Sequence, residues 1–417
     1  MNRFSTSKLF RVLLWILLLT TAGTARADSF AEWKGTKVGR LLQKGDRFIT
    51  EQKWKHLDTT YIKPEKYGWS IYLNTYDGAI RTRADINNVQ LNTLSHFGIN
   101  APMDIHMKMR TGTSERIGLS VGYRGLLIAY SIDIGNHCSK DFTLRSYGKQ
   151  FGGDIRFHTT TNMHGTLSSS FDKTHMKVEV ESLIDRIYNN NNKQIPREQI
   201  GQSIADTLMK VGVLDKQNGE YKAKPMELKE GETKVTAIVG NGYYCANRKH
   251  FSYPAALSNE FRQLRSAGSF IATLAFMHLN MKAESEKMKM ITGGVEGMKL
   301  TQVAAGAGYG YNLVACHSRL LLHASGTAGI LFVNRNRISL ADNDKGDILD
   351  DSELIDRMER NAVNPIAVLR LGAKYRFSDH WFVGSQGLVN RFKVGKQKNY
   401  TMRTTDWLAR LYLTYRF

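Results

Sequence analysis

The sequence predicts an all-β fold, a transmembrane antiparallel outer-membrane β-barrel of about twelve strands. Three observations predict it: a secretory leader, a final strand that alternates strictly and ends on an aromatic residue, and a mildly polar mean hydropathy. No run of about 18 apolar residues follows the leader, so membrane-spanning helices are not expected. Mild polarity is ordinary for a barrel, because only alternate side chains of each strand meet lipid.

Residues 1–27 are typical of a cleaved secretory signal peptide. Basic residues precede an apolar stretch at 12–19, and Ala25-Arg26-Ala27 supplies an A-x-A cleavage site. The apolar stretch is far shorter than the roughly 20 residues that a membrane-spanning helix needs. We therefore expect cleavage after Ala27 and a mature protein, starting at Asp28, in the outer membrane of a Gram-negative bacterium.

The chain is strongly basic. Its formal charge of +20 falls to +16 without the leader, which holds four basic residues and no acidic one. Export makes nucleic acid a poor partner, and the charge is better explained by lipopolysaccharide phosphates, anionic solutes or a crowded basic lumen. The three cysteines are widely spaced, and neither CxxC nor HExxH occurs, so no disulfide framework, metal site or cofactor is expected.

Residues 407–417 form the clearest strand. Apolar residues alternate with Arg410, Arg416 and other mostly polar residues, as the pleat requires when one side meets lipid and the other a wet interior. Ten steps of about 3.3 Å, tilted by about 40°, cross roughly 25 Å, the height of an outer-membrane apolar band. The barrel-closing signal offered to outer lipid and to the outer-membrane assembly machinery is expected to be Trp407, Leu411, Leu413, Tyr415 and Phe417.

Reading back from this strand, short turns at 378–380 and 315–317 alternate with longer links such as 334–363. Short turns face the periplasm in such barrels, and long loops face the exterior. The count of twelve leaves ten and fourteen open, because one strand is weak. The other predicted strands lie near 381–393, 364–377, 318–333, 300–314, 268–281, 233–247, 152–162, 140–148, 117–133, 101–110 and 67–77.

The mature chain divides into two parts. Residues 28–66 form a periplasmic N-terminal segment, and residues 67–417 form the barrel domain. Within the barrel domain, 163–232 is too long for an ordinary loop and is expected to be an extracellular insertion. A helix after Pro196, which suits a first helical turn, and a hairpin near 176–180 are expected inside this insertion.

The register of the predicted strands places cations inside the barrel. A lipid-facing Arg or Lys near the midplane costs about 2 to 4 kcal/mol, so the apolar face must point outward. Twelve strands lie between filled eight-stranded barrels and open sixteen-stranded ones. The lumen is therefore either plugged by a charge network or a narrow porin-like path for small solutes, anions among them. The lumen-lining candidates are Lys108, Arg156, Arg370, Lys374, Arg410 and Arg416.

Two other classes of function are open. His158, Asn162 and His164 lie beside Ser168–Ser170, which invites comparison with outer-membrane phospholipases. The phospholipase pattern of a histidine followed two residues later by Ser-Asn-Gly is absent, so no catalytic residue is assigned and a hydrolase remains the alternative. A surface adhesin acting through 163–232 is the third class.

The loop 342–359 carries eight acids in a basic protein. Hard divalent cations bind such oxygen groups, but an EF-hand centred on Gly346 would need a glutamate at position 352, where Ser352 stands. No metal site is therefore assigned to this loop.

Several segments resemble one known family. They are YIKPEKYGWSIYL at 61–73, GLSVGYRGLLIAYS at 118–131, GKQFGGDIRFHTTTNMHG at 148–165, NGYYCANRKHFSYPAALSNEFRQLRSAGSF at 241–270 and GAGYGYN at 306–312. Together they resemble the domain of unknown function 4421 family of Gram-negative outer-membrane β-barrel proteins. The resemblance covers most of the mature chain and implies a barrel in the cell envelope. It supplies no catalytic residue, ligand or oligomeric state.

Overall fold

A computed structural model of the chain shows a β-barrel. It describes residues 58–89, 103–112, 115–134, 139–171, 173–190, 194–210, 214–217, 220–223, 226–258, 260–284, 295–340, 364–397 and 400–417. The predicted signal peptide, most of the segment 28–66 and the acidic loop 342–359 lie outside these ranges.

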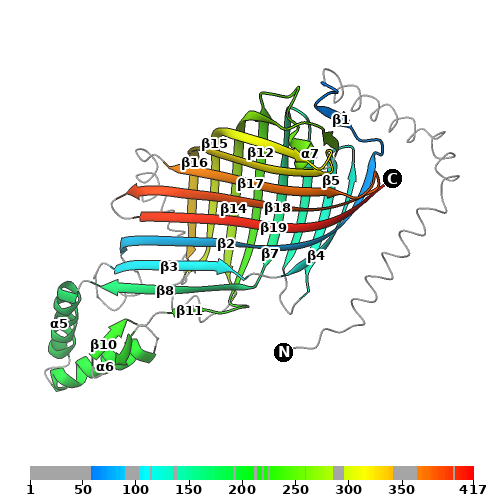
Figure 1. Cartoon of the computed structure of the whole chain (residues 1–417). Coiled ribbons are helices and arrows are strands. Elements are labelled where there is room, and N and C mark those ends of the chain that lie inside the picture. The colour runs from blue at the N-terminus through cyan, green and yellow to red at the C-terminus, as the bar shows by residue number, and fades with distance from the viewer. Residues whose placement is uncertain are drawn as a thin grey trace, which may run out of the picture. The chain divides into compact units, whose positions relative to one another are not determined.

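Twelve antiparallel strands form a closed ring, as the strand count predicted. The last ring strand pairs with the first, from Tyr400↔Ile86 to Arg416↔Ser70, and the first also pairs with the strand beginning at Arg116 (Figure 1). Closure leaves the ring without a free edge, which is what a sheet needs inside a membrane. The ring strands are β2 (Trp69–Val89), β4 (Arg116–Tyr123), β5 (Leu126–Asp133), β6 (Lys140–Tyr147), β7 (Phe151–Thr160), β12 (Thr233–Cys245), β14 (Ala267–Ala283), β15 (Val295–Ala315), β16 (Leu320–Leu340), β17 (Pro365–Arg376), β18 (Trp381–Gln397) and β19 (Tyr400–Arg416).

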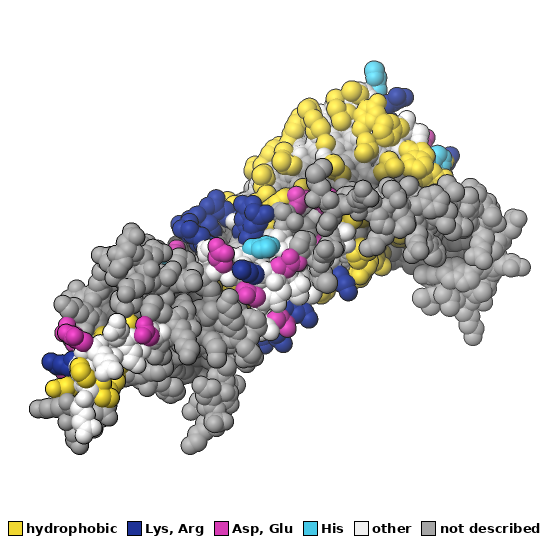
Figure 2. Space-filling model, turned by 90° about the horizontal axis from the view of Figure 1, so that it is seen from below, with side chains coloured by type: hydrophobic (Ala, Val, Ile, Leu, Met, Phe, Trp, Pro, Cys, Tyr) yellow, Lys and Arg dark blue, Asp and Glu magenta, His cyan; other side chains and the backbone are white. Residues whose placement is uncertain are grey.

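The outer wall of the ring carries an apolar band. On β16, side chains from Leu322 to Phe332 alternate between exposed and buried, and the exposed ones are apolar or small. Ten steps of about 3.3 Å at a tilt near 40° give a band roughly 25 Å high. Figure 2 shows this band as a continuous hydrophobic surface on one part of the wall. A closed ring with such a band is a transmembrane barrel.

The ring contains one hairpin that the predicted strands did not resolve. The segment expected as one strand, 117–133, is the hairpin of β4 and β5, with Arg124 and Gly125 at its turn. Both residues have a positive φ, 41° and 85°, as a two-residue hairpin turn requires, and glycine adopts that conformation without strain.

The predicted strand 101–110 does not belong to the ring. It is β3 (Met103–Thr111), which pairs with β2 beyond the point where β4 ends. Two further strands extend this flap, β8 (Met163–Phe171) on β3 and β11 (Met226–Leu228) on β8. The ring gains a strand where 117–133 divides into β4 and β5, and it loses β3 to the flap. The number of ring strands therefore stays at twelve.

The insertion 163–232 thus begins and ends in strands that continue the wall. Between them lie α5 (Lys173–Asn190), α6 (Arg197–Lys210), β9 (Leu214–Gln217) and β10 (Glu220–Ala223). The helix expected after Pro196 is confirmed as α6. The hairpin expected near 176–180 is wrong, because those residues lie within α5. Neither these helices nor the others in the described ranges are long and apolar enough to span a bilayer.

The interior of the barrel has three layers. At the end that holds Phe417, a folded segment enters the lumen; it contains β1 (Ile62–Pro64), α7 (Tyr253–Leu257) and β13 (Phe261–Gln263). A charged layer lies next to it. Beyond that layer, inward-facing apolar side chains pack against one another, and this apolar layer includes Ile80, Met109, Met277, Leu300, Leu331, Phe392 and Met402.

Candidate functional site

A plug made of residues 58–66, 247–258 and 260–266 fills the lumen at the end that holds the C-terminus. Its helix α7 is buried at every residue and is capped at its N-terminus by Ser252, whose side chain accepts a hydrogen bond from the Ala255 backbone N–H. Its strands β1 and β13 pair antiparallel. The link between β12 and β14 is long because it folds into the barrel rather than turning outside it.

Side chains of the barrel wall hold the plug through its backbone carbonyls. Lys374 Nζ donates to Ala255 O at 2.7 Å, and Gln386 Nε2 donates to Leu257 O at 2.8 Å. Tyr72 Oη donates to Ser258 O, also at 2.8 Å. Each of these three wall residues comes from a different strand, so the plug is fastened around α7 from several sides.

A chain of side-chain hydrogen bonds joins the plug to β15 and β16. His323 Nδ1 lies 2.8 Å from Asn312 Oδ1, and His323 Nε2 lies 3.1 Å from Ser325 Oγ. Ser325 Oγ in turn lies 3.2 Å from Tyr253 Oη in α7. Burial raises the pKa of Tyr253 above its usual range, so its hydroxyl stays protonated and can donate to Ser325. This chain fixes the plug to the wall.

The charged layer is built from ion pairs between distant strands. Arg370 on β17 pairs with Asp154 on β7 at 2.7 Å, and Arg156 on β7 pairs with Asp406 on β19. Tyr147 Oη also donates to Asp154, at 3.1 Å. All these groups are buried, so the attraction within each pair must offset the free energy lost when both charges leave water. Removal of one partner would leave the other as an unpaired buried charge.

Two further arginines in this layer are held by neutral groups. Arg145 donates to Gln386 Oε1 at 3.4 Å. Arg410 donates to Asn74 Oδ1 at 2.8 Å and lies over the ring of Tyr412, 4.6 Å from its centroid. Neither arginine has a carboxylate partner among the described residues, so the layer has two more cations than the ion pairs neutralise.

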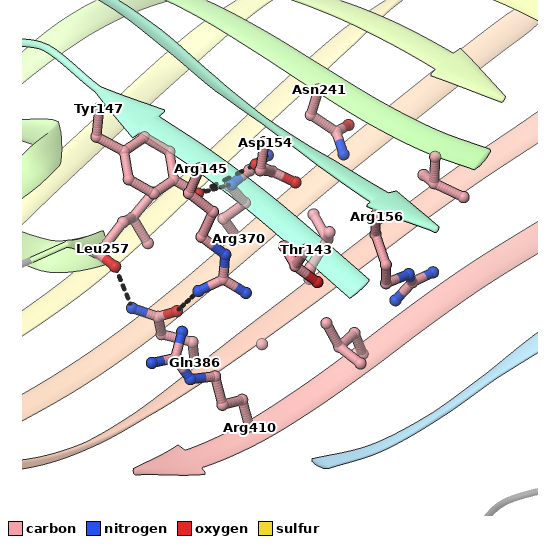
Figure 3. Close-up of a pocket in the computed structure, with 14 residues that line it drawn as sticks. Thr143, Arg145, Tyr147, Asp154, Arg156, Asn241, Leu257, Arg370, Gln386 and Arg410 are labelled. Carbon is pink, nitrogen blue, oxygen red and sulfur yellow. Dashed lines mark hydrogen bonds and ion pairs between the residues drawn. The ribbon is translucent and has the colours of Figure 1, made fainter. Parts of the chain in front are cut away.

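The four arginines converge on a small cavity, which we call the arginine chamber. Figure 3 shows Arg145, Arg156, Arg370 and Arg410 around it, with Asp154 as the acidic residue in its lining. Its volume of about 40 Å³ is room for about three water molecules or one small anion. The plug residue Leu257 lines it on one side, so the chamber lies against the plug.

Several polar atoms in the chamber wall lack a hydrogen-bond partner within the protein. They include Arg145 Nε and Arg410 Nη1, and both polar side-chain atoms of Asn241. Buried donors of this kind need water or an anion, because an unsatisfied charged donor is costly in a low dielectric. The chamber therefore has the charge and the free donors of a small-anion site.

Most of the sequence-predicted lumen residues lie inside the barrel. Arg156, Arg370 and Arg410 line the chamber, whereas Lys374 holds the plug. Arg416 lies at the plug end, with Nη1 3.3 Å from the Glu65 carboxylate. The sequence analysis did not single out Arg145, Gln386 or the plug. The apolar residues around Tyr253-Pro254, in a link too long for a hairpin, were the signal for the plug.

Lys108 does not line the lumen. It is exposed on the outer face of β3, opposite Thr166 of β8. The inward assignment assumed that every outward position meets hydrocarbon. Because β3 lies beyond the apolar band, an outward lysine there avoids the cost of burying a cation in lipid.

The barrel-closing residues share the outer face of β19. Leu411, Leu413 and Phe417 are 60%, 41% and 45% exposed, as side chains that face lipid must be. Trp407 and Tyr415 lie on the same face and are partly covered by neighbours, Tyr415 by the ring of Trp381.

The residues considered for a hydrolase do not converge. His158 points inward, where its Nδ1 lies 2.6 Å from Asp141, and Asn162 is buried. His164 lies on the outer face. Asn312, His323 and Ser325 make a serine–histidine–asparagine chain elsewhere, but the three residues are buried against the plug. No group of three or more metal-ligating side chains occurs among the described residues.

Several solved structures are similar to this chain at low sequence identity. Similar solved structures include the outer membrane protease OmpT from Escherichia coli, at 9% identity over 85% of this chain and 98% of that one, with a TM-score of 0.38. Another is the translocator domain of the autotransporter NalP from Neisseria meningitidis, at 12% identity over 95% of this chain and 100% of that one, with a TM-score of 0.28. At such scores the closed ring, not the likeness, establishes the fold. The sequence matches none of the curated proteins.

A family model does match. The model for a domain of unknown function, DUF4421, covers residues 201–417, which include the plug segment 247–266 and every ring strand from β12 to β19. The match spans more than half of the chain, and the chain belongs to the DUF4421 family.

Proposed function

We propose that this outer-membrane barrel is a narrow channel for small anions, held closed by its plug. The observation that carries the proposal is the arginine chamber, where four arginines meet one lining carboxylate in a cavity inside a membrane-spanning wall. A cavity with excess positive charge and low-dielectric walls concentrates anions. The end of the barrel that holds Phe417 and the plug faces the periplasm in this proposal.

Two barriers separate the chamber from the solvent. On one side, α7 and β13 occlude the lumen; on the other, the apolar layer closes it with side chains such as Met277 and Met402. Methionine side chains are unbranched and repack readily, so the apolar layer can yield to a passing ion. The plug is held by discrete hydrogen bonds and must move as a unit. We therefore expect a channel that is shut at rest and opens when the plug loosens.

The test is single-channel recording of the refolded protein in planar bilayers. A latch variant carrying Tyr72→Phe, Lys374→Met and Gln386→Leu removes the contacts of three wall residues to plug carbonyls and leaves the one that Asn312 makes to Ser252 O. Each hydrogen bond contributes about 1 kcal/mol net. The equilibrium constant between the closed and the open state should therefore fall roughly a hundredfold. We expect rare openings in the wild type and frequent openings in the latch variant.

Selectivity tests the chamber separately. In a salt gradient, the reversal potential of the latch variant should show preference for anions, and adding Arg145→Gln and Arg410→Gln should reduce that preference. Arg319→Gln, at an exposed turn position outside the lumen, is the matched control and should leave it unchanged. A folded latch variant that never opens would contradict the proposal. So would an anion preference that stays the same when Arg145 and Arg410 are both replaced.

A further inference from the structure

A second concentration of positive charge lies on the outside of the barrel, and the lumen plays no part in it. Along the outer faces of β18, β19, β2 and β3, Lys393, Arg403, Arg83 and Lys108 occupy successive register positions. A second row, one pleat away, holds Arg391, Arg81, Arg110 and His164, with Thr405 between the first two. We call these two rows the cation rows; all of their basic residues are exposed.

The register places like charges directly opposite one another. Lys393 faces Arg403, Arg403 faces Arg83, and Arg83 faces Lys108. Neighbouring strands are about 4.8 Å apart, and like charges directly opposite destabilise a sheet. Four cations in one line across four strands therefore repel one another in the isolated protein. An anionic partner that bridges them removes this repulsion.

Acidic side chains nearby do not pair with Arg83, Lys108 or Arg403. Asp85, in the next row, is bound by His106, whose Nδ1 lies 2.9 Å from Asp85 Oδ1. Glu227 lies at the far edge, two strands from Lys108. Among the described residues, no carboxylate forms an ion pair with Arg83, Lys108 or Arg403. Their guanidinium and ammonium groups are thus available to an external anion.

The position of the rows relative to the apolar band indicates what that anion is attached to. In the register, Val389, Trp407 and Ala79 form the last apolar row, and the cation rows begin with the next outward position on each strand. Figure 2 shows Lys and Arg side chains, with Asp and Glu side chains among them, beside the edge of the hydrophobic band. A partner that meets both surfaces has acyl chains against the band and phosphate groups at the rows.

Most residues of the cation rows also line an open groove of about 620 Å³, together with Thr166, Glu227 and Leu228. Such a groove can accept sugar-linked phosphates, which Arg contacts through paired donors and Lys through a point charge. The rows lie toward the end of the barrel opposite Phe417, the outer-leaflet side in the proposed orientation. We propose that the cation rows bind the phosphorylated head group of an outer-leaflet glycolipid, lipopolysaccharide.

The test uses the full-length protein in mild detergent, with purified lipopolysaccharide and its phosphatase-treated form as probes. The row variant carries Arg83→Gln, Lys108→Gln and Arg403→Gln. The control carries Lys140→Gln, Lys249→Gln and Arg319→Gln, three exposed cations away from the rows with the same total charge change. The readouts are the thermal unfolding midpoint and the lipopolysaccharide retained per barrel.

We expect lipopolysaccharide to raise the unfolding midpoint of the wild type and of the control. The row variant should bind it about a hundredfold more weakly, because each basic residue near an anionic lipid surface contributes roughly a factor of five. Without lipopolysaccharide, the row variant should unfold at the same temperature as the wild type or higher, because its repulsion is relieved. This second readout separates lost binding from misfolding.

Three outcomes would overturn the proposal. The row variant could retain as much lipopolysaccharide as the control. The phosphatase-treated form could bind as tightly as the untreated one, which would leave the phosphates without a role. Inorganic phosphate or polyphosphate could stabilise the wild type as strongly as lipopolysaccharide at equal phosphate concentration, which would exclude a lipid-linked ligand as the preferred occupant. None of these results depends on whether the lumen conducts.

Discussion

Trp69 and Phe417 exchange backbone hydrogen bonds where the barrel closes. Phe417 N–H donates to Trp69 O at 3.1 Å, and Trp69 N–H donates to Phe417 O at 3.2 Å. The C-terminal residue is therefore the last rung of the ladder between β19 and β2, and its exposed side chain sits at the rim of the apolar band. The same residue completes the ring and presents an aromatic group to lipid.

We expect Phe417→Ala, Phe417→Asp or deletion of Phe417 to reduce insertion of the exported chain, since we propose that this end of β19 is read by the assembly machinery. The measurement is heat-modifiable gel migration together with membrane fractionation. Phe270→Ala is the control, because Phe270 is a 73% exposed aromatic on the same wall but in mid-chain. An ordinary surface substitution changes stability by only about half a kcal/mol. Equal losses in Phe417→Ala and Phe270→Ala would remove the special role of the C-terminus.

The orientation of the barrel predicts the labelling of a native cysteine. Cys316 is exposed in the turn between β15 and β16, at the same end as Phe417, whereas Cys245 is buried. With Cys138 and Cys245 replaced by serine, a membrane-impermeant maleimide should miss Cys316 on intact cells and reach it after the outer membrane is permeabilised. A cysteine introduced at exposed Lys229, at the opposite end, should label on intact cells. The reverse pattern would invert the proposed orientation.

The ion pair between Arg370 and Asp154 predicts non-additive mutations. Asp154→Asn leaves a buried guanidinium without its carboxylate, and breaking one side of a buried pair costs about 3 to 5 kcal/mol. Arg370→Met should cost a similar amount. The double variant should recover part of the lost unfolding free energy, because it leaves no unpaired buried charge. Urea unfolding in detergent micelles measures all three, and additive losses would show that the pair contributes no coupling.

The hydrogen-bond chain from Asn312 to Tyr253 predicts a local change. His323→Leu should speed hydrogen exchange of the α7 amides roughly tenfold or more, because at least one buried hydrogen bond of about 1 to 2 kcal/mol is lost. Exchange in the ring strands should stay as in the wild type. His278→Leu, which removes a histidine bound to Thr301 on the outer wall, is the control. Uniform acceleration over the whole barrel would mean that His323 supports the wall rather than the plug.

The same chain allows a direct test of the hydrolase alternative. Ser325 is 5% exposed and lies against Tyr253, so we expect no labelling by a fluorophosphonate in the wild type. Labelling of Ser325 in the latch variant, lost in His323→Gln, would favour a hydrolase that acts when the plug is displaced.

Strand pattern, barrel class and the outward face of β19 could be determined from the sequence alone. The reason is local: side chains alternate with a period of two along any strand, and a wrong register would place Arg370 or Arg410 in hydrocarbon. The same local logic failed at Lys108, because alternation assigns a residue to a face but does not say how far along the barrel axis lipid extends. It also missed the turn at Arg124 and Gly125, across which the outward positions change from odd to even residue numbers.

The sites themselves were decided by the tertiary structure. The arginine chamber joins Arg145 to Arg410, and the ion pair between Asp154 and Arg370 links residues 216 positions apart in the sequence. The plug is inside the lumen because its carbonyls are met by Tyr72, Lys374 and Gln386 from separate strands. Such contacts depend on the register of every intervening strand and on closure of β19 against β2. Those are properties of the whole ring, and no local stretch of sequence contains them.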